Sequence, residues 1–140
     1  MEILIDKNID LDWLLEREPF LQAAKDIMEP CISGQRRGHL ASHTILNTFY
    51  IARKQKSVKE RKEILLLLCK KFNVIGIDRP MIMKSLQNDA WDDLEDGLQM
   101  HCADMEELDY IVTRDPKGFE TSPVPVFSPE EFLALTNTKK

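Results

Sequence analysis

The sequence predicts an α/β protein with three layers, α/β/α, in which helices cover both faces of a mainly parallel central sheet. Short apolar runs typical of buried strands alternate with longer segments whose apolar residues recur at helical spacing. The 140 residues are 43% hydrophobic, 31% charged and 7% aromatic, which is typical of one globular domain and excludes a disordered or collagen-like chain. A chain of this length buries roughly two thirds of its unfolded surface, so one core is enough.

The N-terminal half is expected to begin with a central strand. The apolar run 3–5 stops at an acidic residue, as in a strand buried on both faces of a sheet. Apolar spacing predicts two helices between residues 8 and 33, the second opened by Pro19 and closed by Gly34. Residues 39–42 form a weaker candidate strand.

Two further helices are expected before the next strand. The first contains Asn47, and the second opens at a capping box in which Ser57 and Glu60 bond each other's backbone amides. The second helix runs through Lys71, and we expect its leucine run 65–68 to be buried.

The C-terminal half continues the alternation. Residues 74–77 are predicted as a strand, Pro80 starts a helix, a longer helix covers 91–105, and a strongly apolar strand covers 110–113.

The chain is expected to end on an edge strand and a short helix. Pro125 has no amide proton, so the strand 124–127 belongs at a sheet edge. A cap headed by Ser128 predicts the final helix. We expect one domain over 1–135 and a frayed tail over 136–140.

Charge and cysteine content narrow the function classes. The net charge of -5 gives no overall field toward nucleic acid or an anionic membrane, so any nucleic-acid contact must be local. No apolar run approaches the ~20 residues of a membrane span, and the N-terminus lacks the positive charge of a signal peptide. Odd in number and far apart, the cysteines are expected to be buried free thiols of a cytoplasmic protein; they are Cys31, Cys69 and Cys102.

One run of positive charge is a candidate for phosphate contacts. Six of the ten residues 53–62 are basic, and the candidate RNA contacts among them are Lys54, Lys56 and Lys59. The alternative is that this run is only a solvated helix end.

Two aspartates follow predicted strands. Asp6 comes directly after the first strand, and Asp115 comes two residues after the strand 110–113. If those strands are neighbours, both carboxylates lie at the carboxyl edge of the sheet, where open parallel sheets place their sites. Repulsion would raise the pKa of each unless a cation lies between them, and such oxygen ligands favour Mg²⁺ or Mn²⁺. The alternative for either aspartate alone is a cap of the next helix or turn.

An acidic cluster opens the helix predicted over 91–105. Asp92 and Glu95 have the spacing of a helix cap, and acids in a first turn complement the helix dipole. Asp96 lies beyond that cap on a face shared with Met100, so it is a candidate inward carboxylate, which needs a partner.

These positions together resemble the PIN-domain family, the metal-dependent ribonucleases common as toxins of type II toxin–antitoxin pairs. The resemblance covers nearly the whole chain and rests on ILIDKN at 3–8, LEDGL at 94–98 and DYIVTRDP at 109–116. It implies a small α/β/α domain with acidic residues gathered at the carboxyl edge of its sheet.

The resemblance also implies an activity and partners. Asp6, Asp96 and Asp115 would be three of the acidic catalytic residues and would hold one or two Mg²⁺ or Mn²⁺ ions for the hydrolysis of RNA. An antitoxin protein would cover the acidic cleft, and antitoxin-paired members of the family commonly form homodimers.

The chain departs from the family pattern near these acids. Lys7 stands where a small hydroxyl residue is usual, Asp10 where an aliphatic residue is usual, and Gly97 where alanine is usual. The family's second acid aligns with Asn47, whose amide brings no charge to a metal. Lys7 either partly replaces a cation or turns away toward a phosphate. The accessory candidates are Lys7, Asn8, Asn47, Asp92 and Glu95.

The sequence leaves two functions open. The first is a metal-dependent endoribonuclease paired with an antitoxin. The second is a PIN-like domain that has lost catalysis and binds RNA or a protein partner, which Lys7 and Asn47 together allow. Three carboxylates kept in one cleft despite their repulsion favour the first function.

Overall fold

A parallel sheet organises the computed structural model, which describes residues 1–137. Its order is β3-β2-β1-β4-β5, and every pairing in it is parallel, as predicted. The strands are β1 (Glu2–Ile5), β2 (Arg37–Ala41), β3 (Asn73–Ile75), β4 (Tyr110–Val112) and β5 (Val126–Phe127). The helices are α1 (Lys7–Leu14), α2 (Leu21–Ile32), α3 (Ser42–Ile51), α4 (Val58–Lys71), α5 (Arg79–Gln87), α6 (Leu94–Met105) and α7 (Pro129–Asn137), with 3-10 turns η1 (Ala52–Lys54) and η2 (Pro116–Phe119).

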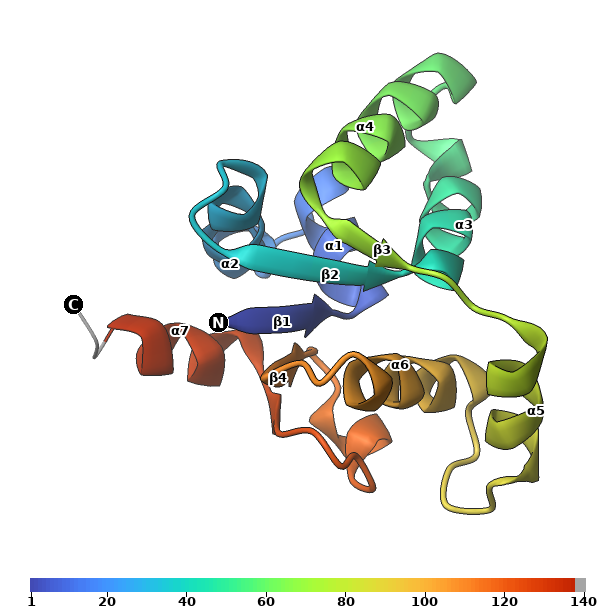
Figure 1. Ribbon diagram of the computed structural model, residues 1–140. Helices are drawn as coiled ribbons and strands as arrows, with labels where there is room; N and C mark the ends of the chain where they lie inside the picture. Colours follow the sequence, from blue (N-terminus) through green and yellow to red (C-terminus); the bar gives the residue numbers. More distant parts are fainter. Residues whose placement is uncertain (138–140) are drawn as a thin grey trace.

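The central strand β1 separates two hydrophobic cores. Ile3 and Ile5 pack into one core with side chains of α2, α4 and α7, whereas Leu4 packs into the other with α5 and α6. Successive side chains of a strand point to opposite faces, so a continuous apolar run serves both cores. Figure 1 shows the result, with α1 to α4 on one side of the sheet and α5 and α6 on the other. The three-layer α/β/α prediction is confirmed.

The strands that end in aspartate are neighbours. Ile5 lies opposite Val112 in the ladder of β1 with β4, and the Asp6 amide donates to the Val112 carbonyl at 3.0 Å. The chain runs from β1 to β2 on one side and reaches β4 on the other, so strand order reverses at β1. This reversal opens a site at the carboxyl ends of β1 and β4.

The leucine run of α4 is only half buried, so the expectation for 65–68 was wrong in part. Leu65 and Leu68 are buried, but Leu66 and Leu67 are 57% and 38% exposed. A run of four apolar residues wraps around a helix, and only the positions three apart face the core.

Several predicted boundaries shift by a few residues. The second helix begins at Leu21 rather than at Pro19, although Gly34, with φ of 87°, follows its end as predicted. Residues 74–77 were predicted as a strand, but β3 ends at Ile75. The strand predicted over 39–42 covers 37–41, and Ser42 begins α3.

The end of the chain is more ordered than predicted. The capping box headed by Ser128 is present, because Ser128 and Glu131 exchange backbone-to-side-chain hydrogen bonds. Residues 136 and 137, predicted as frayed, belong to α7, and the Thr136 hydroxyl donates to the Phe132 and Leu133 carbonyls. The rest of the predicted tail, 138–140, lies outside the described residues.

The helix predicted from residue 91 begins at Leu94. Asp93, not Asp92, caps it by accepting the Asp96 amide at 3.0 Å. The Trp91 indole instead donates to the Ser85 carbonyl and lies against Gly97, where a Cβ would overlap the ring. This contact gives the physical reason for glycine at position 97.

Cysteine placement agrees with the prediction at two positions of three. Cys31 and Cys102 are buried free thiols whose pKa is raised by burial, whereas Cys69 is exposed on α4. Within residues 1–137, no helix has the length and apolar character needed to cross a membrane.

A buried carboxyl group links α1 to α3. Asp10 is fully buried and accepts a hydrogen bond from the Thr48 hydroxyl, which is also fully buried. Burial raises the pKa of Asp10 to about 7, because desolvation penalises the charged form more than this one bond favours it.

We expect Asp10→Asn to flatten the dependence of stability on pH. The pKa of Asp10 is higher in the folded chain than in the unfolded chain, so its stabilising effect is full at about pH 4 and is lost as pH rises through about 7. Urea unfolding at pH 5 and pH 8 measures the difference, which should be smaller in Asp10→Asn than in the wild type. The exposed Asp26→Asn is the control, and equal pH dependence in all three proteins would contradict a titrating Asp10.

Candidate metal centre

Asp6 is held rigidly at the end of β1. Its carboxylate caps α1 by accepting the Lys7 amide at 2.8 Å. The Gln99 amide donates to Oδ1 and the Thr113 hydroxyl donates to Oδ2, both at 2.7 Å. The side chain is 4% exposed, so these donors replace the water that a buried carboxylate needs.

Thr113 connects the two strand-ending aspartates. Its hydroxyl donates to Asp6 and accepts the Asp115 amide at 3.0 Å. The Thr113 side chain is fully buried, whereas Asp115 is exposed at the start of η2. The orientation of one aspartate is therefore coupled to the backbone of the other.

Asp96 and Asp115 converge on Gly118. A Cβ at Gly118 would lie 2.7 Å from Asp96 Oδ2 and 3.4 Å from Asp115 Oδ2, so the missing side chain leaves the space that both carboxylates share. Burial and the negative charges of Asp93, Asp6 and Asp115 raise the pKa of Asp96 to about 7. The structure thus brings together the three aspartates that the sequence singled out.

Arg114 fixes the segment between Thr113 and Asp115. Its Nε donates to Asp12 Oδ2 at 2.6 Å, and its guanidinium lies 3.8 Å from the centre of the Phe20 ring. Asp12 is 1% exposed, so this ion pair anchors the end of β4 to α1.

Lys7, Glu95 and Asn47 form a second group at the same edge. Lys7 Nζ lies 2.6 Å from Glu95 Oε2, and the Asn47 amide donates to Glu95 Oε1 at 2.9 Å. Of the two orientations open to Lys7, the structure has the one in which its ammonium lies among the carboxylates.

The remaining predicted residues are Asn8, Asp92 and the lysines of the basic run, and of these Asp92 lines the same hollow as Asp96. Within residues 1–137, Asn8 makes no hydrogen bond to the three aspartates. Asp92 is exposed and lines, with Asp96 and Gly118, a hollow of about 240 Å³. The lysines of the basic run come after the C-terminal end of α3, which is the end far from β2. Lys54 is in η1, Lys56 lies just before α4, and Lys59 lies in its first turn.

Three further residues of the site were not predicted from the sequence: Gln99, Thr113 and His43. Gln99 stands three residues after Asp96, which is the spacing of one helix face, so this signal was present in the sequence. His43 opens α3 beside Glu95, and burial lowers its pKa while Glu95 and Asp6 oppose that shift. The three histidines have no metal-ligand spacing in the sequence, and only the fold shows where His43 lies.

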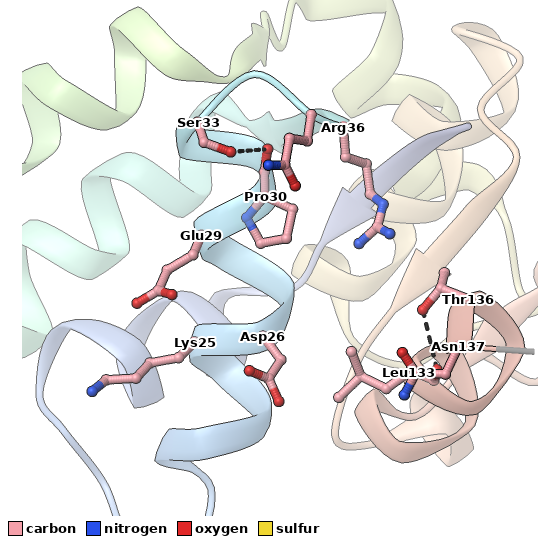
Figure 2. Close-up of a pocket in the computed structure, with 10 residues that line it drawn as sticks. Lys25, Asp26, Glu29, Pro30, Ser33, Arg36, Leu133, Thr136 and Asn137 are labelled. Atoms are coloured by element: carbon pink, nitrogen blue, oxygen red, sulfur yellow. Dashed lines mark hydrogen bonds between the residues drawn. The ribbon is translucent and has the colours of Figure 1, made fainter. Parts of the chain in front are cut away.

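A larger pocket lies at the opposite edge of the sheet. It has a volume of about 650 Å³ and separates the end of α2 from α7. Figure 2 shows Arg36 reaching into this space, with Leu133 and Thr136 on the facing helix. Its lining includes charges of both signs, Lys25, Asp26, Glu29 and Arg36, without a convergent set of carboxylates.

The three aspartates, Asp6, Asp96 and Asp115, form an acidic group whose donor atoms fit Mg²⁺ or Mn²⁺. Its ligands are carboxylate oxygens, which suit hard divalent ions. The pKa of Asp96 is raised by burial and by repulsion from neighbouring carboxylates, and a cation would relieve that repulsion. Within residues 1–137, no three carboxylate, imidazole or thiol groups stand close enough to form a ready-made cage. Asp6 is fixed by its donors, so adjustment falls to Asp96 and the exposed Asp115.

Comparison with known proteins identifies the class to which this chain belongs. The model of the PIN-domain family matches residues 2–117, so the chain belongs to the PIN-domain family. No curated protein matches it by sequence.

Solved structures share the fold. A toxin–antitoxin complex from Klebsiella pneumoniae has a TM-score of 0.68 at 23% identity, over 91% of this chain and 97% of that one. VapBC2 of Rickettsia felis, bound to a promoter DNA fragment, has a TM-score of 0.65 at 16% identity, over 91% of this chain and 98% of that one. VapC20 of Mycobacterium tuberculosis is a toxin that cleaves the sarcin–ricin loop. It has a TM-score of 0.62 at 9% identity, over 78% of this chain and 86% of that one.

We expect Gly118→Ala to weaken Mn²⁺ binding about tenfold, which corresponds to ~1.4 kcal/mol. The added methyl group would push the Asp96 carboxylate away from Asp115. Calorimetric titration of Mn²⁺ measures the change. Gly76→Ala is the matched control, because a Cβ at that position meets no atom within 4 Å. Unchanged affinity in Gly118→Ala would argue against a metal between these two carboxylates.

Proposed function

We propose that this protein is a metal-dependent endoribonuclease, the toxin of a type II toxin–antitoxin pair. The observation that carries the proposal is the convergence of Asp96 and Asp115 on Gly118, beside the fixed carboxylate of Asp6. Membership of the PIN-domain family supports it, as does the likeness of fold to toxins found with antitoxins and to one that cleaves the sarcin–ricin loop.

Each acidic side chain has a defined task in this proposal. Asp6, Asp96 and Asp115 would hold Mg²⁺ or Mn²⁺, which when bound lowers the pKa of a water molecule and neutralises charge on the phosphate. Gln99 and Thr113 keep Asp6 oriented. With its pKa at about 7, Asp96 holds a proton for part of the time at neutral pH, so metal binding weakens as pH falls below 7.

The partners proposed for the chain are an RNA substrate, an antitoxin protein and a second copy of itself. In structures of similar fold, toxins are complexed with antitoxins, and some of these complexes are bound to DNA. A cytoplasmic location fits such partners. The chain's own candidate contacts to RNA are Lys54, Lys56 and Lys59.

A second function is a PIN domain that binds RNA or protein without cleaving. The observation that favours it is the Lys7 ammonium, which pairs with Glu95 inside the acidic group. Metal binding separates the two functions, because a domain without catalysis needs no divalent ion.

We expect Asp96→Asn to abolish both Mn²⁺ binding and Mn²⁺-dependent RNA cleavage, because it removes a ligand charge without changing the shape of the side chain. Calorimetry measures the first effect, and a pool of fluorophore–quencher RNA oligonucleotides measures the second. Asp104→Asn, an exposed acid on the same helix, should behave as the wild type does. Failure of the wild type to bind millimolar Mn²⁺ would rule out the nuclease and leave the binding function.

We expect the double charge reversal Lys56→Glu and Lys59→Glu to weaken RNA binding. It should also lower the slope of log affinity against log salt by about 0.7 for each lost phosphate contact. Fluorescence anisotropy with a single-stranded RNA, in the Asp96→Asn background to prevent cleavage, measures both. Lys25→Glu with Lys84→Glu is the control of equal charge. The same slope in both double variants would assign the basic run to a solvated helix end.

A further inference from the structure

The Lys7 side chain is held by an ion pair among the carboxylates next to Asp6, and it does not extend freely into water. Lys7 directly follows Asp6, in the first turn of α1, and its ammonium lies 2.6 Å from Glu95 Oε2. The side chains of Lys7 and Glu95 are only 30% and 40% exposed, so water screens this pair less than a pair on the open surface.

Asn47 holds the carboxylate partner of Lys7. Its amide donates to Glu95 Oε1 at 2.9 Å, so one oxygen of Glu95 is bound by an ammonium and the other by an amide. An acid at position 47 would have no proton to donate and would repel Glu95. The two departures from the family pattern, Lys7 and Asn47, therefore act on the same carboxylate.

The charge of Lys7 acts on the aspartates as well. Besides Glu95, the ammonium faces Asp6 and Asp93, and it opposes the rise in the pKa of Asp96. His43 faces Glu95, Lys7 and Asp6 from α3, and burial favours its neutral form. Lys7 thus supplies positive charge to all of these carboxylates.

We propose that Lys7 is a built-in cation that takes the place of one divalent ion in the acidic centre. Its ammonium, held by Glu95 and Asn47, neutralises carboxylate charge that a further ion would otherwise neutralise, so the wild type binds one divalent ion fewer than a variant without the ammonium. An ammonium is a compact point charge, which makes lysine suited to this task. The proposal rests on the proposed metal centre but does not require cleavage of RNA.

The stoichiometry of Mn²⁺ binding tests this role without RNA. Calorimetry and Mn²⁺ paramagnetic resonance should give one more bound ion in Lys7→Met than in the wild type. Lys7→Arg keeps the charge and should retain the wild-type number. Lys84→Met, a lysine on the exposed face of α5, is the matched control and should also retain it.

Thermal unfolding gives a second readout. Without divalent ions, Lys7→Met should have a lower Tm than Lys84→Met, because the carboxylates lose their internal cation. Added Mn²⁺ should then raise the Tm of Lys7→Met more than that of the wild type. Lys7→Gln, with a polar side chain, serves in the same measurements if Lys7→Met does not fold.

Equal stoichiometry in the wild type and in both uncharged variants, with equal response of Tm to Mn²⁺, would overturn the role of Lys7. That result is distinct from failure of the proposed function. If stoichiometry depends on Lys7 but no RNA is cleaved, the built-in cation stands and the nuclease is rejected.

Discussion

The parallel pairing of β1 with β4 is the constraint on which the site depends. It places Asp6 beside Thr113, whose hydroxyl then reaches both the Asp6 carboxylate and the Asp115 amide. A shift of one residue in this register would turn every side chain of β1 to the opposite face of the sheet. Ile3 and Ile5 would then point toward the core that Leu4 occupies. Two hydrophobic cores therefore fix the register, and the register fixes the carboxylates. Stability and site geometry come from the same ladder of hydrogen bonds.

The acidic edge is electrostatically unfavourable when considered alone. Three aspartates and the nearby Asp93 lie close enough for their charges to repel, and this repulsion adds to burial in raising the pKa of Asp96. The fold offsets it with directed donors from Gln99 and Thr113 and with one ammonium. Asp10 lies away from this edge, and desolvation raises its pKa without a contribution from another carboxylate. Burial thus raises the pKa of both carboxyl groups, and at Asp96 the neighbouring carboxylates raise it further.

Much of this arrangement was predictable from the sequence, because its signals are local. The run 3–5 followed by Asp6 and the apolar strand before Asp115 predicted two strands that each end near an aspartate. That these strands are neighbours was only a condition of the prediction, and the structure meets it. Contacts between distant segments were not predictable, because no spacing records them. The hydrogen bonds of Glu95 join it to residues 88 and 48 positions away, Lys7 and Asn47. Likewise, a run such as 65–68 shows hydrophobicity but not which side of a helix meets the core.

The contact of Trp91 with Gly97 links two positions that must change together. The indole lies where a side chain at 97 would project, and its ring nitrogen is bonded to the Ser85 carbonyl. A chain with alanine at position 97 must have moved or lost this indole, whereas a chain that keeps the tryptophan must keep the glycine. A side chain at position 97 is therefore accommodated only together with a change at position 91, so residues 91 and 97 should covary among related chains.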